Sequence, residues 1–416
     1  MKDTKQNMKY IVILCDGMSD LPCAELGGGT PMSVAAKPNM NRLAAVSEVG
    51  MVQTVPAGLA PGSDVANLSV LGYDPERYYT GRSPLEAESM DLHMDENDIA
   101  IRTNLVTLSD CDNFLDATMV SYCGDDIGND AAREIINLMQ GELGSDTLRF
   151  HFGMSYRHCT IQKGGCRKER ALPVLRSESD RGEGERIQVG LDLTPPHDII
   201  GKRIGDYLDP DSEFTAIMER SYKLLKGKQA NCVWFWGEGK KATLPSFYEK
   251  YGKRGAIISA VDLLKGIGKL AGMDVLHVEG ATGYIDTNFA GKAQAAIGAL
   301  RGDCDFVFLH LEAPDECGHR GEVANKVKSL ELIDDLILAP ILREFGGEPV
   351  RIMILPDHPT PLSLMTHTSD PVPYLIYDST LVKESKVVNF CEAAAESTGV
   401  FVPVGHELMG EFLQVC

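Results

Sequence analysis

Three short apolar runs of this chain, 11–14, 306–309 and 352–355, are each followed by side chains that could bind a metal ion. Those side chains are Asp16, Asp315, His319, Asp357, His358 and, a little further on, His367. A mixture of carboxylate and imidazole donors suits manganese or zinc and is poorly suited to calcium. Two metal ions about 3.5–4 Å apart would need roughly six or seven such ligands, and the set is that large.

Ser63 adds a hydroxyl that could act as a nucleophile. It follows Pro61-Gly62 and precedes the helical pattern 65–71, so we expect it at a helix N-terminus. Backbone N–H groups and the helix dipole favour a phosphoryl group there, and a metal ion could lower the pKa of the hydroxyl. Stabilising the charge on three equatorial oxygens is what phosphoryl transfer chiefly requires.

Each of these residues also has an ordinary structural explanation when it is taken alone. Ser63 could cap a helix, Asp16 could begin a turn with Gly17, and His367 could be a buried structural histidine. Their joint occurrence favours the metal site, because an α/β chain has no structural need for this many donors at successive strand ends.

The elements that must hold these residues follow the pattern of an α/β fold. Apolar runs alternate with amphipathic segments, most regularly from residue 213 onward, and this predicts a mostly parallel sheet covered by helices on both faces. The expected strands are 11–14, 51–55, 232–235, 256–259, 275–278, 306–309, 352–355 and 372–377, and the expected helices are 33–46, 65–71, 213–225, 260–271, 291–300 and 322–344, the last kinked near Pro340. Open sheets of this kind place ligands at the carboxyl ends of their strands, where the predicted ligands lie.

The middle of the chain has a different pattern of residue types. Alternating aromatic and β-branched residues over 99–108 and 148–162, separated by a predicted helix at 131–143, indicate an inserted α+β domain. Residues 177–185, SESDRGEGE, have no periodicity and are predicted to form a loop. We expect a core made of residues 1–87 and 201–416, interrupted by a smaller domain at residues 88–200.

The composition of the chain is typical of a globular protein and disfavours nucleic-acid-binding and membrane proteins. The chain has 416 residues, 44% of them hydrophobic and 24% charged, which is ordinary for a globular protein. Its net charge of −20 would repel nucleic acid and anionic membranes, so we expect neither as a partner. No apolar run is long enough for a membrane-spanning helix, the first ten residues lack the pattern of a signal peptide, and the 11 cysteines form no CxxC pair, so we expect a cytoplasmic protein with reduced thiols.

Several motifs now make the chain recognisable. They are CDGM at 15–18, PGSDVANLSVLGYDP at 61–75, HLEAPDECGHRG at 310–321, PDH at 356–358 and THT at 366–368. Together they resemble the archaeal-type, cofactor-independent phosphoglycerate mutases of the alkaline phosphatase superfamily, and the resemblance covers nearly the whole chain. It implies an alkaline-phosphatase-like core and two divalent metal ions, Mn²⁺ or Zn²⁺ with Mg²⁺ as the alternative, and no 2,3-bisphosphoglycerate cofactor. The matching positions imply that Asp16, Ser63, Asp357 and His358 bind one metal ion and that Asp315, His319 and His367 bind the other.

The resemblance also implies a reaction and a substrate. Ser63 would take the phosphoryl group from 3-phosphoglycerate, the glycerate would reorient without leaving, and its other hydroxyl would take the group back. The inserted domain would close over this small phosphorylated hydroxy acid and exclude water. Arg102, Arg157 and His158 resemble family positions that bind the substrate.

The substrate side departs from the family pattern. An arginine-rich family segment corresponds here to residues 121–127, SYCGDDI, and a family Arg-Gly-x-Gly motif corresponds to Trp236-Gly237-Glu238-Gly239. Acidic residues in place of arginines would suit an amine, and a bacterial branch that resembles this pattern has been proposed to phosphorylate homoserine. In that case Asp125, Asp126 or Glu238 would pair with the substrate ammonium. A phosphomonoesterase, which admits water to the same metals and serine, is the other alternative.

Overall fold

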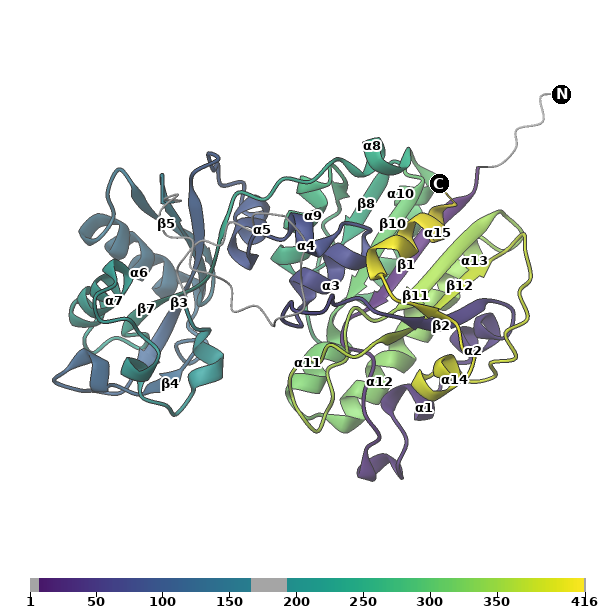
Figure 1. The fold of residues 1–416 in the computed structure, drawn as a ribbon, viewed down its shortest axis with the longest axis horizontal. Helices are drawn as coiled ribbons and strands as arrows, with labels where there is room; N and C mark the ends of the chain where they lie inside the picture. The colour runs from purple at the N-terminus through teal and green to yellow at the C-terminus, as the bar shows by residue number, and fades with distance from the viewer. Residues whose placement is uncertain (1–6, 166–192, 415–416) are drawn as a thin grey trace. The chain divides into compact units, whose positions relative to one another are not determined.

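The computed structural model describes residues 7–165 and 193–414 and divides into two compact units, each with its own sheet (Figure 1). The larger unit consists of Met1–Tyr79 and Thr243–Cys416, and the smaller unit is Thr80–Ala242. The observed boundaries differ from the expected ones, because residues 80–87 and 201–242 belong to the smaller unit. The predicted loop at 177–185 lies outside the described residues.

The larger unit is built on an eight-stranded sheet with the order β13-β2-β12-β11-β1-β10-β8-β9. The strands are β1 (Lys9–Cys15), β2 (Glu48–Val52), β8 (Gly255–Ile258), β9 (Asp274–Val275), β10 (Phe306–Leu311), β11 (Val350–Leu355), β12 (Val372–Asp378) and β13 (Phe401–Val402). Strands β11, β1, β10, β8 and β9 run parallel, and β12 is antiparallel to both of its neighbours. The expectation of a mostly parallel α/β sheet is therefore confirmed.

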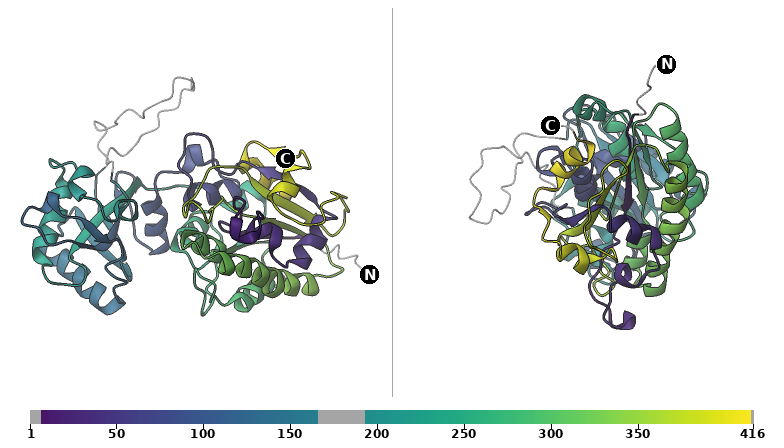
Figure 2. Two further views of the ribbon diagram at one scale, coloured as in Figure 1. Left: turned by 90° about the horizontal axis from the view of Figure 1, so that it is seen from below. Right: turned by 90° about the vertical axis from the view of Figure 1, so that its right-hand side faces the viewer.

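Helices cover both faces of this sheet (Figures 1 and 2). Strand β1 is buried from Tyr10 to Cys15, so Ile11 and Ile13 point into one core while Tyr10 packs edge-on against Phe412 on the opposite face. The helices on the first face include α2 (Pro38–Ala44), α10 (Phe289–Arg301), α12 (Val323–Ile333) and α13 (Ala339–Glu344). Those on the second face include α3 (Ser63–Val70), α8 (Phe247–Tyr251), α9 (Asp262–Leu270) and α15 (Leu408–Leu413).

Proline divides two of the expected helices. The helix expected at 33–46 is two, α1 (Pro31–Val34) and α2, because Pro38 fits only the first turn of a new helix. The long helix expected at 322–344 is α12 and α13 joined by a π-helical segment, Asp334–Leu338, just before Pro340. Within that segment the buried Asp334 carboxylate accepts hydrogen bonds from the backbone N–H groups of Asn39 and Met40 and so caps α2.

The smaller unit is an antiparallel sheet with helices packed against it. Its strands are β3 (Ile99–Leu108), β4 (Met119–Ser121), β5 (Leu148–Met154), β6 (Arg157–Gln162) and β7 (Cys232–Lys240), and its longer helices are α5 (Arg82–Ser89), α6 (Asn129–Glu142) and α7 (Glu213–Leu224). The order is β4-β3-β6-β5, with β7 paired to β3. The expectation that β7 belongs to the parallel sheet was wrong, because it pairs antiparallel with β3 over nearly its whole length.

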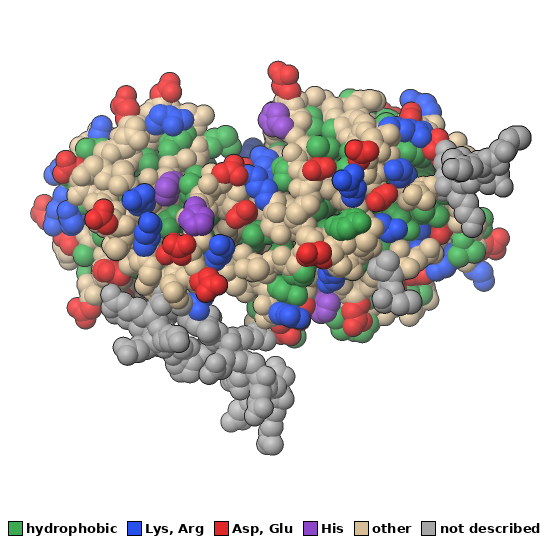
Figure 3. All heavy atoms as spheres, turned by 90° about the horizontal axis from the view of Figure 1, so that it is seen from above, with side chains coloured by type: hydrophobic (Ala, Val, Ile, Leu, Met, Phe, Trp, Pro, Cys, Tyr) green, Lys and Arg blue, Asp and Glu red, His purple; other side chains and the backbone are tan. Residues whose placement is uncertain are grey.

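The surface carries charges of both signs, and the cysteines of the described residues form no disulfide. Acidic and basic side chains are interspersed over the face shown in Figure 3. Nine cysteines of the described residues are free thiols. Among the same residues, no helix is both long and apolar enough to cross a membrane.

Candidate metal centre and nucleophile

The order of the sheet brings the predicted ligands of the larger unit together. Strand β1 lies between β10 and β11, and all three run parallel, so their carboxyl ends meet at one edge. Asp16 follows β1 directly, and Asp357 and His358 follow β11 after a single residue. Asp315 lies in α11 (Ala313–His319), which begins just after β10.

A first group of ligand atoms comes from Asp16, Asp357 and His358, all buried and within 4.8 Å of one another. The Nε2 atom of His358 is 3.6 Å from Asp16 Oδ1 and 3.4 Å from Asp357 Oδ2. The Ser63 hydroxyl oxygen lies 3.1 Å from the same Nε2. The predicted nucleophile therefore faces the predicted ligands.

A second group adjoins the first. Asp315, His358 and His367 also place ligand atoms within 4.8 Å of one another, so His358 borders both groups. His319 Nε2 is 3.4 Å from Asp315 Oδ2 and 2.8 Å from His367 Nε2. The structure thus brings together all seven residues that the sequence predicted for metal binding and nucleophilic attack.

The hydrogen bonding and charge of the first group fit a bound cation. Asp16 Oδ1 is buried and has no hydrogen-bond partner among the described residues. Burial and the nearby carboxylates of Asp357 and Asp315 raise the pKa of Asp16 well above its usual value, while burial lowers the pKa of His358. The carboxylates of Asp16 and Asp357 beside the neutral imidazole of His358 are a donor set that a divalent metal ion would stabilise.

In the second group two imidazole nitrogens face each other. His319 Nδ1 lies 3.0 Å from the backbone carbonyl oxygen of Met365, to which only an N–H can donate, and this leaves Nε2 turned toward Asp315 and His367. Burial disfavours a protonated His319, but the hydrogen bond and charge of Asp315 outweigh it and raise the pKa of His319 to about 9. Either a proton or a metal ion would satisfy this arrangement.

The Ser63 hydroxyl does not cap a helix. Ser63 is the first residue of α3, and the N-cap position belongs to the extended Gly62. The neighbouring Asp64 carboxylate accepts hydrogen bonds from the backbone N–H of Val65 at 2.9 Å and from the Tyr79 hydroxyl at 2.6 Å. The capping explanation for Ser63 is therefore wrong, and its hydroxyl is directed at His358.

Three further residues hold the ligands in place. His310 donates from Nε2 to Asp16 Oδ2 at 2.8 Å and accepts at Nδ1 from the Ser259 hydroxyl, and burial lowers the pKa of His310 to about 3, so that it stays neutral. The Asn67 side-chain amide, one helical turn after Ser63, donates to the Ser63 carbonyl and to Asp357 Oδ2, both at 2.8 Å. Asn67 was not predicted from the sequence, although its position four residues after Ser63 puts it on the same helix face.

The three residues expected to bind substrate lie in the smaller unit, and the sheet separates them. Arg102 is paired with Cys159 and Asn104 with Arg157, whereas His158 is paired with Thr103. Because neighbouring residues of a strand point to opposite faces, Arg102 and Arg157 share one face and His158 lies on the other. His158 is buried, its Nδ1 accepts a hydrogen bond from Gly153 N at 3.1 Å, and burial lowers its pKa to about 3.

Arg102 belongs to a charged cluster on its face of the sheet. Its guanidinium forms an ion pair with Glu86 and stacks 4.9 Å above the Trp236 ring. Glu86 also pairs with Arg82 Nε at 3.0 Å. Burial raises the pKa of Glu86, but the charges of Arg102, Arg82 and Arg157 outweigh it and lower that pKa below its usual value. Arg82 and Glu86 were not predicted from the sequence, although they lie four residues apart on α5, a spacing that brings two side chains together.

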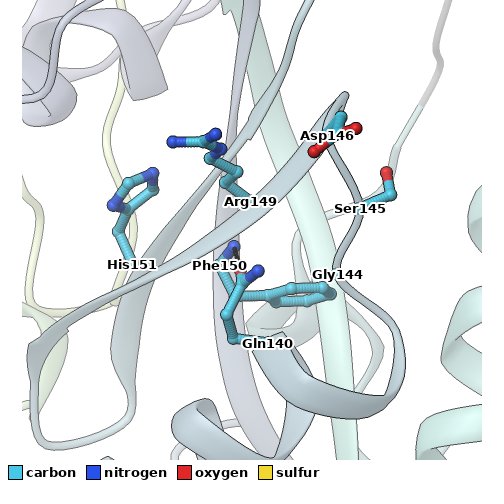
Figure 4. A pocket seen from close by; sticks show the side chains of 7 residues that line it. All are labelled: Gln140, Gly144, Ser145, Asp146, Arg149, Phe150 and His151. Carbon is cyan, nitrogen blue, oxygen red and sulfur yellow. Dashed lines mark hydrogen bonds between the residues drawn. The ribbon is translucent and has the colours of Figure 1, made fainter.

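The remaining sequence candidates are acidic residues of the smaller unit. Asp125 and Asp126 are exposed residues of a turn with positive φ, and Glu238 is half-buried on β7. A hollow of about 670 Å³ is lined by residues of α6, β5 and the turn between them, which are Gln140, Gly144, Ser145, Asp146, Arg149, Phe150 and His151 (Figure 4). It contains none of the residues predicted for metal or substrate binding.

Comparison with known proteins agrees with this geometry. Residues 8–413 match the model of the Metalloenzyme superfamily. The chain is 42% identical to the 2,3-bisphosphoglycerate-independent phosphoglycerate mutase of Methanosarcina barkeri, and the match covers 97% of this chain and 98% of the relative. A protein of the same name from Methanothrix thermoacetophila is also 42% identical, with the same coverage.

Solved structures extend the comparison. The PH0037 protein from Pyrococcus horikoshii has a TM-score of 0.74 and 28% identity and covers 98% of both chains. The cofactor-independent phosphoglycerate mutase from Thermoplasma acidophilum, at 23% identity and a TM-score of 0.57, shares the fold, with 98% of this chain and 99% of that chain covered. From the match to the superfamily model and the full-length similarity to these relatives, the chain belongs to the 2,3-bisphosphoglycerate-independent phosphoglycerate mutase family of the metalloenzyme superfamily.

Proposed function

We propose that this protein interconverts 3-phosphoglycerate and 2-phosphoglycerate through a phosphoserine at Ser63. The observation that carries the proposal is the position of the Ser63 hydroxyl, 3.1 Å from His358 Nε2, at the residue that both groups of ligands share. The relatives at 42% identity bear the name of this activity and match the chain over almost its whole length.

Two divalent metal ions are part of the proposal. Asp16, Ser63, Asp357 and His358 would hold one, and Asp315, His319 and His367 would hold the other. Asp16 Oδ1 is buried without a hydrogen-bond partner in the described part of the chain, and the donors are a mixture of carboxylates and imidazoles. Both features favour Mn²⁺ or Zn²⁺, with Mg²⁺ as the alternative. When bound, such ions lower the pKa of a serine hydroxyl and offset the charge that builds on the transferring phosphoryl group.

The phosphoryl group would be transferred in two half-reactions, first to Ser63 and then back to the glycerate. In the first, a bond forms between Ser63 Oγ and phosphorus, the bond from phosphorus to the 3-oxygen of the substrate breaks, and that oxygen takes the proton that Ser63 loses. In the second, a bond forms between the 2-oxygen of the retained glycerate and phosphorus, the bond from phosphorus to Ser63 Oγ breaks, and Ser63 Oγ takes the proton that the 2-hydroxyl loses. Asn67 holds the Ser63 backbone and Asp357 in fixed relation throughout.

Arg102 and Arg157 are proposed to bind the negatively charged groups of the substrate. They share one face of the smaller sheet, where Arg102 forms an ion pair with Glu86. Guanidinium groups match the geometry of carboxylate and phosphate groups, and this favours an anionic substrate over an amine. His158, on the opposite face, is left out of the proposed group.

Phosphorus NMR tests the proposal directly. The zinc- or magnesium-loaded protein is incubated with 3-phosphoglycerate, because paramagnetic manganese would broaden the lines. Formation of 2-phosphoglycerate without free phosphate supports the mutase, and Ser63→Ala should abolish it while the zinc content stays close to that of the unmodified protein. Free phosphate alone would indicate a phosphomonoesterase. No turnover would redirect the test to homoserine as acceptor, together with a phosphoryl donor.

A further inference from the structure

Thr360 lies between the two groups of predicted ligands. It follows His358 by two residues, and its side chain is completely buried. Its hydroxyl oxygen is 2.5 Å from Asp315 Oδ1, in the second group, and 3.3 Å from His358 Nδ1. One hydroxyl therefore touches a member of each group.

The direction of these two hydrogen bonds is fixed by chemistry. A hydroxyl has a single hydrogen to donate, and an ionised carboxylate can only accept. Thr360 must therefore donate to Asp315 and accept from His358. It follows that His358 carries its proton on Nδ1, and that the lone pair of Nε2 points toward Ser63, Asp16 and Asp357.

The backbone of Thr360 is held by a buried ion pair. The Lys326 ammonium and the Asp20 carboxylate lie 2.7 Å apart with side-chain exposures of 0% and 1%. Lys326 also donates to the Thr360 carbonyl at 2.7 Å, and Asp20 accepts from the Leu362 N–H at 3.1 Å. Both members of this buried ion pair therefore hold the backbone of the turn that carries Thr360.

Close packing leaves Thr360 little freedom to move. A Cβ atom added to Gly17 would lie 2.5 Å from the Thr360 hydroxyl oxygen, and one added to Gly318 would lie 2.6 Å from the Thr360 carbonyl oxygen. Only glycine at these two positions lets the backbone approach Thr360 this closely.

We propose that Thr360 is a positioning residue that fixes the tautomer of His358 and couples the two metal sites, and that Lys326 and Asp20 hold it in place. The proposal rests on the two-metal site of the proposed function. A partner that orients a metal-binding histidine through its second ring nitrogen typically changes metal affinity by about 10- to 100-fold when it is removed. Because the hydroxyl also holds Asp315, its removal should weaken both sites together.

Zinc titration of three variants tests this coupling. Thr360→Val keeps the shape and removes the hydroxyl, whereas Thr360→Ser keeps the hydroxyl. Thr287→Val is the matched control, because Thr287 is also buried in the larger unit and its hydroxyl accepts only the backbone N–H of Thr282 among the contacts described. The Val variant at 360 should bind both zinc ions about 10- to 100-fold more weakly, the Ser variant should recover to within about threefold, and the control should match the unmodified protein.

The result that would overturn the proposal is wild-type zinc affinity at both sites of Thr360→Val, or a loss confined to one site. Long-range proton–nitrogen NMR of the unmodified, zinc-loaded protein is a measurement that needs no variant. It should show the proton of His358 on Nδ1, and a proton on Nε2 would contradict the inference even where Thr360→Val fails to fold.

Neither measurement uses a phosphorylated substrate, so failure of the mutase assay leaves the test intact. If the unmodified protein binds no zinc, the coupling proposal falls, whatever the assay with 3-phosphoglycerate shows.

Discussion

Gly17 offers a quantitative test of how tightly the metal centre is packed. It follows Asp16 and has φ +62°, a conformation that costs a residue with a side chain about 1–2 kcal/mol. A Cβ atom there would also lie 2.7 Å from both Cα and Oδ1 of Asp315, distances at which neighbouring atoms must shift. Overpacking of this kind typically costs about 1–3 kcal/mol, so Gly17→Ala should lower the free energy of unfolding by about 2–5 kcal/mol.

A second glycine separates the two contributions. Gly27 has φ +65°, but nothing lies within 4 Å of the Cβ position. Gly27→Ala should therefore lose only about 1–2 kcal/mol, the cost of the backbone conformation. The difference between the two variants measures the crowding of Gly17 against Asp315 and Thr360 and should be about 1–3 kcal/mol.

Urea unfolding of the metal-depleted variants gives both numbers, because removing the metal leaves only the protein's own packing. Zinc affinity measured on the same samples should fall for Gly17→Ala, since Asp315 must move, and stay unchanged for Gly27→Ala. Equal free energies of unfolding for the two variants would refute the reasoning, because the contacts with Asp315 and Thr360 would then contribute nothing.

Three other predictions concern charged groups. Asp357→Asn should lower the amount of bound zinc measured by elemental analysis, and an unaltered stoichiometry would remove Asp357 from the ligand set. The pKa of His319 is raised from 6.5 to about 9, so in the metal-free protein its stabilising pair with Asp315 is fully present below about pH 6.5 and is lost as the pH rises to about 9. The melting temperature of chelator-treated protein should fall over that interval, and His319→Gln should flatten the profile. Glu86→Gln leaves the buried Arg102 without its carboxylate and should cost about 3–5 kcal/mol in urea unfolding, and a loss below about 1 kcal/mol would show that the pair is dispensable.

The larger unit and its ligands could be predicted because they depend on local signals. Buried strands such as 11–14 and 306–309 are short apolar runs, and parallel strands of a βα pattern end at one edge, so acids and histidines after those runs had to meet. The same reasoning found the helix that begins at Ser63. The cytoplasmic location and the absence of a nucleic-acid partner remain predictions from charge and composition.

What could not be predicted depends on pairing between distant segments. Residues 232–235 read equally well as a strand of either sheet, and only the partner, β3, assigns them to the smaller unit. His158 was grouped with Arg102 and Arg157 because sequence alone does not give the register that puts it on the other face. Thr360 carried no signal at all, since a threonine in a loop becomes informative only once Asp315 and His358 are seen on either side of it.

The π-helical segment at Asp334–Leu338 limits which single-residue deletions the protein can tolerate. A π turn amounts to one residue inserted into an α-helix, and each residue of an α-helix adds about 100° of rotation. Deleting one residue there would restore a regular helix, but it would rotate α13 about the helix axis relative to α12. Either the Asp334 cap of α2 or the apolar side of α13 at Ile341 would then turn away from its partner. Single-residue deletions should therefore be tolerated poorly in this helix and well in an exposed surface turn.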